Sequence, residues 1–487
     1  MGNWGVPALE HSEPWFRIKS KIQSIETDGL PEACRKNIFA SLDQSNPRML
    51  NGGATRSLAA IFLRYWRSTA FFAAIGDFFA VLTAAALPWS TTLVVIFALC
   101  WLGAVALMID YGVYFQSLKR PICFLPFALF GLAVVGTLWS DATWDERLHV
   151  IGPTARLLML PGLFYHFERS SRGMWVLVAF LASCTVVMVT SWIVAFNPGF
   201  TLKSAGTEVC GVFVKNYIDQ GQEFALCAAA LVYPIILLLR ERKWLWTAAL
   251  TALALSFILN MTFVVSSRTA LLTIPILFMI VVLLQLNWRA AVPLSVVAIV
   301  LGLAMAQSPR MCPTFDTLGD YQRYHDSNAE TSTGLRLEFW KKSIGFFREA
   351  PVIGHGTGSI RGLFEKAAVG KTGAEAVVVA NPHNQTLNVA VQWGVVGVAV
   401  LYAMWLSHLM LFRRGGWAAC MGLLIVVQNI LSSLVNSHLF DFNESWMYVF
   451  GVGIAGGIQL RRQREISRQS LEPDVRSAIN AANEPHP

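Results

Sequence analysis

The residues best suited to chemistry in this chain stand together at Asn381, Pro382 and His383, at the end of a long polar stretch. Asparagine caps helices and proline suits a first helical turn, so we expect a helix to begin at Asn381 with His383 at its outer tip. The positive end of the helix dipole would favour a neutral imidazole, which accepts protons. The same end attracts anions such as phosphate. The stretch therefore predicts a base beside an anion site.

Three cations are candidates for that anion site. Lys215 and Arg268 stand in turns between apolar runs that are long enough to cross a membrane. Removing a cation from water at a membrane's edge is costly, so each must face water, a partner or a bound anion. For Arg268 the alternatives are a diphosphate ligand and an arginine that extends to lipid headgroups. Arg336 lies on a predicted amphipathic helix at 333–349, and its alternative role is an ordinary structural ion pair.

Apolar segments must position these residues. The sequence is 55% hydrophobic and 14% charged, with a mean hydropathy of +0.50, which is typical of a polytopic membrane protein. We predict an all-α polytopic membrane protein of about twelve transmembrane helices, with a large, partly helical insert between spans nine and ten. The predicted spans are 69–87, 91–109, 122–139, 150–166, 174–196, 219–239, 244–264, 268–286, 291–306, 385–411, 417–437 and 445–460.

The cations between these runs set the topology. They gather in alternate loops, for example Lys119-Arg120 and Arg413-Arg414, which the positive-inside rule places in the cytoplasm. Both termini are then cytoplasmic and the insert lies on the outer face. The predicted regions are a basic cytoplasmic extension (1–68), spans one to nine (69–306), the outer insert (307–384), spans ten to twelve (385–460) and a cytoplasmic tail (461–487).

The insert divides in two. Residues 308–332 are polar and read as exposed loop, whereas 333–349 predict an amphipathic helix with an apolar stripe on one face. The glycine-rich segment 354–359 lacks the lysine and the preceding strand of a phosphate-binding loop, and it favours a turn that lets the insert fold back.

Polar residues at membrane depth have two interpretations. Asp219 and Glu223 share one helical face near Lys215 and could orient a ligand or a base. We expect Asp77 and the amides to join helices by hydrogen bonds. The amides in question are Asn260, Gln428, Asn429 and Asn436.

The sequence predicts no metal site. The eight cysteines lack metal-ligand spacing, and His438, Asp441 and Glu444 in the last outer loop lack a third convincing ligand. Cys210 and Cys312 both fall in predicted outer loops, so a disulfide between them stays open. The net charge of +8 resides in loops and tails, which argues against nucleic-acid binding.

Five motifs, in this order on a twelve-span frame, make the chain resemble the superfamily of O-antigen ligases and O-antigen polymerases. The resemblance covers roughly 200–460 and leaves out the first 68 residues. The motifs are SRTALL at 267–272, GLRLEFW at 334–340, APVIGHG at 350–356, NPHNQTL at 381–387 and WGVVG at 393–397.

The resemblance implies an inverting, metal-independent glycosyltransferase without cofactors, at the periplasmic face of a bacterial inner membrane. Its donor would be a glycan on undecaprenyl diphosphate. Its acceptor would be the lipid A–core in a ligase, which we favour, or another lipid-linked glycan in a polymerase. The family's histidine maps onto His383 and its diphosphate-binding arginine onto Arg268; Lys215 is the nearest match to a second family cation. We also expect Arg336, Asn381 and Asn384 to contact substrate.

A flippase or secondary transporter is the alternative from another class, because it too has about twelve spans with polar residues at membrane depth. The sequence contains no internal repeat, and transport leaves the long insert that ends at His383 unexplained. A transferase releases undecaprenyl diphosphate, whereas a flippase leaves the donor linkage intact.

Overall fold

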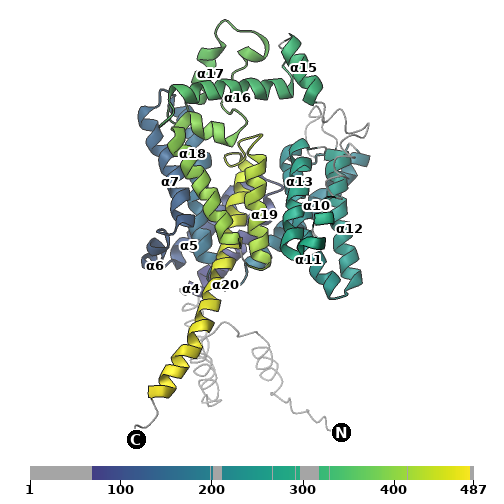
Figure 1. Ribbon diagram of the computed structural model, residues 1–487, viewed down its shortest axis with the longest axis vertical. Coiled ribbons are helices and arrows are strands. Elements are labelled where there is room, and N and C mark those ends of the chain that lie inside the picture. Colours follow the sequence, from purple (N-terminus) through teal and green to yellow (C-terminus); the bar gives the residue numbers. More distant parts are fainter. Residues whose placement is uncertain are drawn as a thin grey trace, which may run out of the picture. The chain divides into compact units, whose positions relative to one another are not determined.

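The structure is a computed structural model, and it separates residues 1–68 from residues 69–487 as two units. The first unit, which holds the predicted basic extension, lies outside the described residues, as do Cys210 and Cys312. All regular secondary structure in the described residues of the second unit is helical (Figure 1). The structure describes residues 69–197, 199–200, 211–265, 267–290, 292–294, 296, 317–327, 330–413 and 415–482.

Seven helices among the described residues are long and apolar enough to cross a membrane. Lipid offers the backbone no hydrogen-bond partners, and an α-helix satisfies its polar groups within one segment. These helices agree with seven of the predicted spans. They are α4 (Thr69–Ala86), α5 (Thr91–Met108), α7 with η2 (Pro121–Trp139), α10 (Gly173–Phe196), α11 (Tyr217–Arg240), α12 with η4 (Trp244–Val265) and α18 (Gln385–Phe412).

The remaining predicted spans differ in their outcomes. α19 (Trp417–Ser432) is an apolar helix shorter than a full span, and the apolar part of α13 (Arg268–Gln285), Thr269–Gln285, also falls just short. α20 (Phe442–Ala482) is 41 residues long and contains the predicted last span. The predicted span 291–306 lies mostly outside the described residues. Twelve spans thus stay a prediction.

The segment 150–166, which was predicted as a span, is a broken helix and is not among the helices long and apolar enough to cross a membrane. α8 (Trp144–Ala155) begins with a capping box at Thr143, and the short turn η3 (Arg156–Leu158) separates it from α9 (Met159–Phe167). Pro153 lies inside α8, where it removes a backbone donor, and this accounts for a break near the end of that helix.

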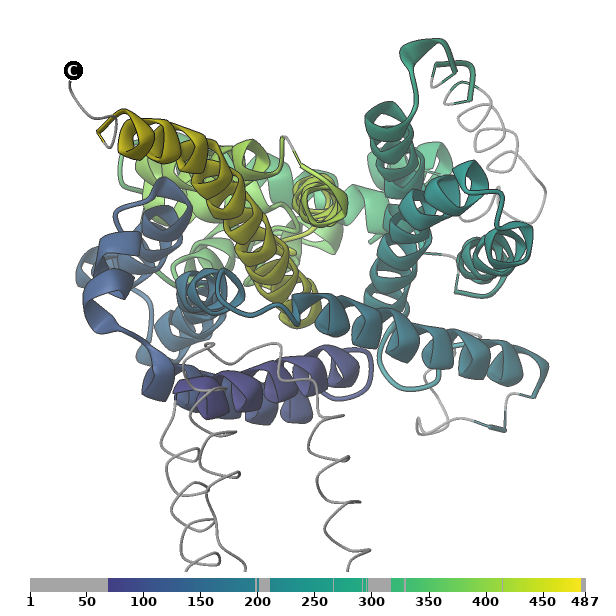
Figure 2. The ribbon, with the colours of Figure 1, turned by 90° about the horizontal axis from the view of Figure 1, so that it is seen from below.

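Close packing of α20 on α9 forms the centre of the larger hydrophobic core. A Cβ atom at Gly453, Gly456 or Gly457 would collide with α9, so small residues let the two backbones approach. α4 and α5 lie side by side as a hairpin at the edge of this group (Figure 2). A second core joins α10, α11, α12 and α13.

Asp77 joins three helices, as its position at membrane depth predicts. Its Oδ1 accepts hydrogen bonds from Ser170 Oγ at 2.6 Å and from His166 Nε2 at 2.8 Å. His166 Nδ1 accepts from Trp101 Nε1, which fixes the tautomer that donates to Asp77. The buried carboxylate is therefore structural.

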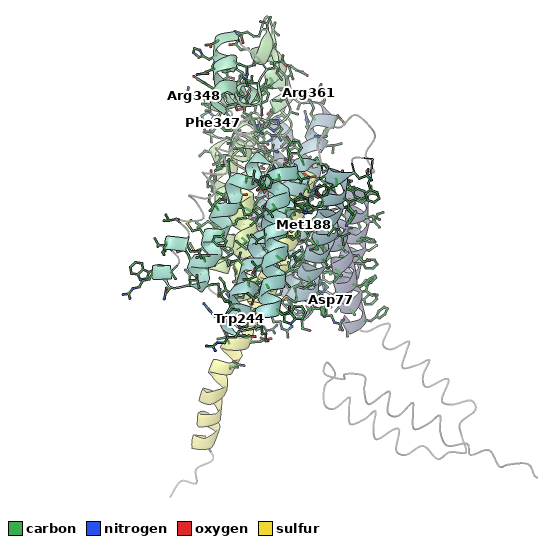
Figure 3. All side chains as sticks on the ribbon, turned by 90° about the vertical axis from the view of Figure 1, so that its right-hand side faces the viewer. Asp77, Met188, Trp244, Phe347, Arg348 and Arg361 are labelled. Atoms are coloured by element: carbon green, nitrogen blue, oxygen red, sulfur yellow. The ribbon has the colours of Figure 1, made fainter. Side chains whose placement is uncertain are left out.

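Different residues gather at the two ends of the helices. At one end Glu168 pairs with Arg120 at 3.6 Å and with Arg464 at 3.9 Å, so cation-rich loops meet there. At the opposite end Gln385 N donates to Ser433 O, and the insert helices cover the loops. Figure 3 shows Asp77 and Trp244 toward the first end and Phe347, Arg348 and Arg361 at the second. The separation agrees with the alternation of charge in the sequence.

The described part of the insert forms three α-helices and a short 3-10 turn. The prediction of exposed loop at 308–332 is wrong in part, because α15 (Thr317–Ser327) forms there; Tyr324 of this helix donates to buried Glu338 at 2.8 Å. The predicted amphipathic helix is confirmed as α16 (Ser332–Glu349). Its buried aromatic residues, Phe339 and Phe346, pack on α17 (Ile360–Ala368) and α18. η6 (Gly373–Ala376) follows.

Candidate active site

His383 lies in a tight backbone turn between η6 and α18. Its φ of 52° is in the left-handed region, which is uncommon for a residue other than glycine. Asn381 holds the turn: its Oδ1 accepts from His383 N at 2.9 Å and from Ser437 Oγ at 2.7 Å. A costly local conformation held by its neighbours is a frequent property of functional residues.

The His383 ring is oriented by a second loop. His383 Nδ1 lies 2.8 Å from Asn436 Oδ1, in the segment 433–441 that links α19 to α20. An amide oxygen only accepts, so Nδ1 carries the proton and donates it. The lone pair of the neutral ring is then on Nε2. This is the tautomer that a base acting through Nε2 requires.

The surroundings of His383 favour its neutral form. Burial lowers the pKa of His383 below 6.5 and the nearby guanidinium of Arg336 lowers it further, while the hydrogen bond to Asn436 opposes them. The Phe339 ring stacks at 6.1 Å between centroids. At neutral pH the ring is uncharged and can take a proton.

The predicted cap of α18 is wrong. Asn384 caps the helix, because its Oδ1 accepts from Leu387 N at 3.0 Å, and Gln385 is the first helical residue. Asn381 and Asn384 are both suitable residue types for a helix cap. Asn384 is the cap because it is the one that accepts a hydrogen bond from the backbone N–H three residues ahead. Asn384 Nδ2 also donates to Leu434 O at 2.8 Å. His383 precedes the cap, so burial rather than the helix end is the main cause of its lowered pKa.

α16 brings Arg336 to this turn. Arg336 and Phe339 are one helical turn apart, and Phe339 also packs edge-on against Phe364 of α17 at 5.8 Å. The charge of Arg336 acts on both His383 and His438, which places it near both histidines. The insert thus delivers a cation to the loop that carries the base.

The glycine-rich segment of the insert docks into a break in α18. Gly394 has φ 62° and ψ −157°, which interrupts the helix. His355 N donates to Val391 O and Gly356 N to Gln392 O, both at 2.9 Å, and Val395 N donates to Pro351 O at 2.8 Å. The motifs 350–356 and 393–397 therefore satisfy each other's backbone groups, and the predicted fold-back of the insert is present.

The two outer cations of the sequence analysis lie at the start of neighbouring helices. Arg268 is the first residue of α13, and only its backbone is described. Ser267 before it packs against Gly221 of α11. Lys215 precedes α11 and donates to Leu87 O and Asn443 Oδ1. Two of the three N–H groups of Lys215 are thereby bonded.

One comparison with protein families gives a match. Residues 253–402 match a family model described as O-antigen ligase. This match supports the O-antigen ligase and polymerase superfamily for the segment that it covers. The matched segment contains Arg268, Arg336 and His383, whereas Lys215 and Asn436 lie outside it. No curated protein matches the chain.

The superfamily is one of glycosyltransferase-like enzymes. The helices that are long and apolar enough to cross a membrane agree with it.

The sequence analysis missed Asn436 as a partner of His383, because the predicted span 417–437 included it as an amide that joins helices. α19 ends at Ser432, so Asn436 stands in a loop. The polar run from Ser432 onward was the signal that the span ends early.

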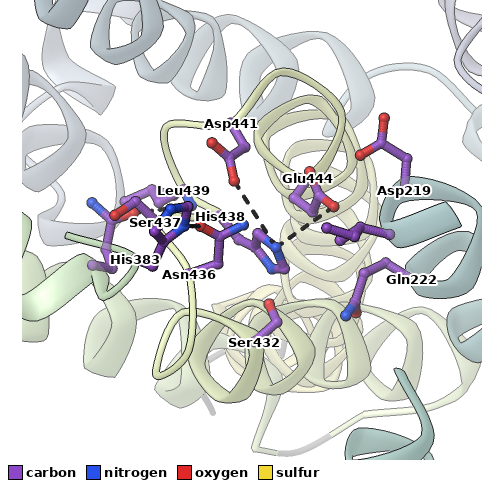
Figure 4. Close-up of polar contacts among 12 residues, drawn as sticks. Asp219, Gln222, His383, Ser432, Asn436, Ser437, His438, Leu439, Asp441 and Glu444 are labelled. Atoms are coloured by element: carbon purple, nitrogen blue, oxygen red, sulfur yellow. Dashed lines mark hydrogen bonds and ion pairs between the residues drawn. The ribbon is translucent and has the colours of Figure 1, made fainter. Parts of the chain in front are cut away.

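A second group of polar residues lies in the same loop. His438 points between Asp441 and Glu444, while His383 and Asn436 lie on its other side (Figure 4). Ligand atoms of His438, Asp441 and Glu444 all lie within 4.8 Å of one another. The sequence analysis grouped these three residues in the last outer loop but predicted no metal site there. The loop before α20 and the first turn of that helix bring their ligand atoms together.

Proposed function

We propose that this protein is an O-antigen ligase, which transfers a glycan from undecaprenyl diphosphate to a hydroxyl group of the lipid A–core. The observation that carries the chemistry is the hydrogen bond from His383 Nδ1 to Asn436, which leaves Nε2 as a base beside the cation of Arg336. The choice of a ligase over a polymerase comes from the sequence resemblance.

The reaction is a single displacement. His383 Nε2 takes the proton of the acceptor hydroxyl as its oxygen attacks C1 of the first donor sugar. The bond from C1 to the diphosphate oxygen breaks, the diphosphate leaves with the electron pair, and C1 is inverted. A general base typically contributes ~10²–10⁴-fold to such a step.

The leaving group needs positive charge. Arg268, Lys215 and Arg336 would stabilise the negative charge that develops on the diphosphate. Arg268 offers a planar fork for two phosphate oxygens, whereas Lys215 offers its remaining N–H group. Asn381 and Asn384 would set the turn that carries the base and contact the sugars. Protein groups alone carry this step.

The site would lie at the periplasmic face of the bacterial inner membrane, with both termini in the cytoplasm. The supporting observation is that cation-rich loops meet at Glu168, at the end opposite His383. Cytoplasmic loops are the ones enriched in lysine and arginine. The lipid-linked donor would reach the site from the surrounding bilayer.

The test uses purified full-length protein in detergent, a labelled undecaprenyl-diphosphate glycan, and lipid A–core present or absent. His383→Asn removes the base but suits the left-handed backbone, and His325→Asn on exposed α15 is the matched control. We expect label on lipid A–core with the wild type and the control, and none with His383→Asn.

Two other outcomes would contradict the proposal. A longer lipid-linked glycan in the absence of lipid A–core would mean a polymerase with the same chemistry. An intact donor with no product under either condition would reopen the transporter interpretation.

A further inference from the structure

The cluster of His438, Asp441 and Glu444 has the geometry of an ion site. His438 Nε2 lies 3.9 Å from Asp441 Oδ2 and 3.8 Å from Glu444 Oε1. These separations are too long for hydrogen bonds. A tetrahedral ion about 2.0–2.2 Å from each ligand would hold such atoms about 3.3–3.6 Å apart, so both separations would need to shorten by a few tenths of an ångström when the ion binds.

The polar atoms of this cluster are buried without partners. Within the described residues neither ring nitrogen of His438 nor Oε1 of Glu444 has a hydrogen-bond partner, and these residues are 1% and 6% exposed. An unsatisfied buried polar group is costly, and native proteins rarely keep several together. The unpartnered imidazole is aimed at the two carboxylates (Figure 4).

A metal ion would satisfy these atoms together. A neutral histidine ring binds a metal ion through the lone pair of one nitrogen, and carboxylate oxygens supply the other ligand atoms.

The surrounding charges favour a bound cation. Asp219 and Glu223 of α11 add two carboxylates to the same region. Arg156 donates to the main-chain oxygen of Asp441 at 2.8 Å, and Lys215 is bonded to Leu87 O and Asn443. Arg156 and Lys215 thus bind atoms other than the three ligand atoms of the cluster.

We propose that His438, Asp441 and Glu444 bind one divalent transition-metal ion. A nitrogen ligand beside two carboxylate oxygens suits Mn²⁺ or Zn²⁺ better than Mg²⁺, which prefers oxygen ligands alone. Three protein ligands leave further coordination positions for water.

The ion would fix the segment 433–441 at its carboxyl-terminal end. The same segment bonds His383 through Asn436 and Asn381 through Ser437. This role is structural and supplements the metal-free transfer proposed above. It departs from the sequence-based expectation of no metal site.

Binding of Mn²⁺ alone tests the proposal, with no activity measurement. The full chain without a polyhistidine tag is purified in detergent, stripped with a chelator and titrated with Mn²⁺, and free Mn²⁺ is followed by electron paramagnetic resonance. Zn²⁺ competition is measured in the same cell. We expect one tight site per chain, with affinity lowered at least about ten-fold in His438→Ala and in Glu444→Gln.

The control variant is His325→Ala, which removes a histidine whose side chain is 68% exposed. This variant should bind Mn²⁺ as tightly as the wild type does. Mn²⁺ should also raise the thermal unfolding temperature of the wild type and not that of Glu444→Gln. If His438→Ala fails to fold, the conservative variants Glu444→Gln and Asp441→Asn decide. Absence of stoichiometric binding, or binding unchanged in both conservative variants, would overturn the proposal.

Discussion

His383 Nδ1 and Asn436 Oδ1 lie 2.8 Å apart, although 53 residues separate them in the chain. The bond joins the turn before α18 to the loop before α20. It fixes the tautomer of the proposed base and the direction of its ring at once. Neighbouring bonds from Ser437 to Asn381 and from Asn384 to Leu434 hold the same two loops together. The base thus depends on a contact between loops.

Asn436→Ala should lower the rate of transfer by about 10–100-fold, because a misdirected base loses its alignment with the acceptor hydroxyl. Donor KM should change little, since Asn436 orients the ring and need not touch the diphosphate. Steady-state kinetics with purified protein measures both values. A variant with wild-type kcat would remove Asn436 as a positioning residue.

Asn436→Asp provides a sharper readout of the same contact. A carboxylate at Nδ1 favours the imidazolium, so it should raise the pKa of His383 and move the acid limb of the rate profile upward by about one pH unit. A merely structural asparagine would change the rate without moving this limb.

The wild-type rate should fall in acid. Burial and Arg336 lower the pKa of His383 below 6.5, so the base is neutral above that pH and is lost only as the pH falls through the lowered value. Asn436→Asp should move only the His383 limb, which assigns it.

The sequence analysis predicted the helical class and the positions of seven spans, because long apolar runs have few alternatives in lipid. It also predicted α16 and the fold-back at 354–359. It could not distinguish Asn381 from Asn384 as a cap, since the two residue types are identical. Asn384 caps the helix because its side chain accepts from Leu387 N, whereas the side chain of Asn381 accepts from Ser437 Oγ instead.

Contacts between distant loops were beyond the sequence. Asn436 belongs to a segment that reads as the end of an apolar run, and its partner His383 comes from the turn before α18. His438 was placed in the last outer loop, and its neighbour Glu444 comes from α20. Their roles follow from where α19 stops, and helix ends are the least certain part of a pattern-based prediction. The partners of these residues are set by which distant loops lie together in the fold, and residue type alone does not show this.

Arg268→Ala should lower kcat/KM for the donor by about 10²–10³-fold, the range for loss of one group that stabilises developing charge. Arg268→Lys should recover part of this loss, because it keeps the charge and gives up the bidentate geometry. Acceptor KM should be unaffected. Equal effects of the two variants would contradict a bidentate phosphate contact.

Lys215 separates a substrate role from a structural one. Its bonds to Leu87 O and Asn443 tie the hairpin between α4 and α5 to α20, so Lys215→Met should lower the thermal unfolding temperature in detergent. If Lys215 also holds the diphosphate, the folded fraction of this variant should show a raised donor KM. An unchanged donor KM with lowered stability would leave Lys215 as a structural cation.

Gly394→Ala should destabilise the junction between the insert and α18. Its φ of 62° with ψ −157° is almost restricted to glycine, and a Cβ atom would overlap the Val352 carbonyl. A conformation of this kind costs about 1–3 kcal/mol for other residues, before the overlap is counted. The matched control is Gly345→Ala in α16, where nothing lies within 4 Å of the added Cβ, and it should gain about 0.5–1 kcal/mol. Unfolding in detergent measures both variants. If Gly394→Ala were as stable as Gly345→Ala, the backbone hydrogen bonds that Pro351 O accepts and that His355 N and Gly356 N donate would not be what holds the insert on α18.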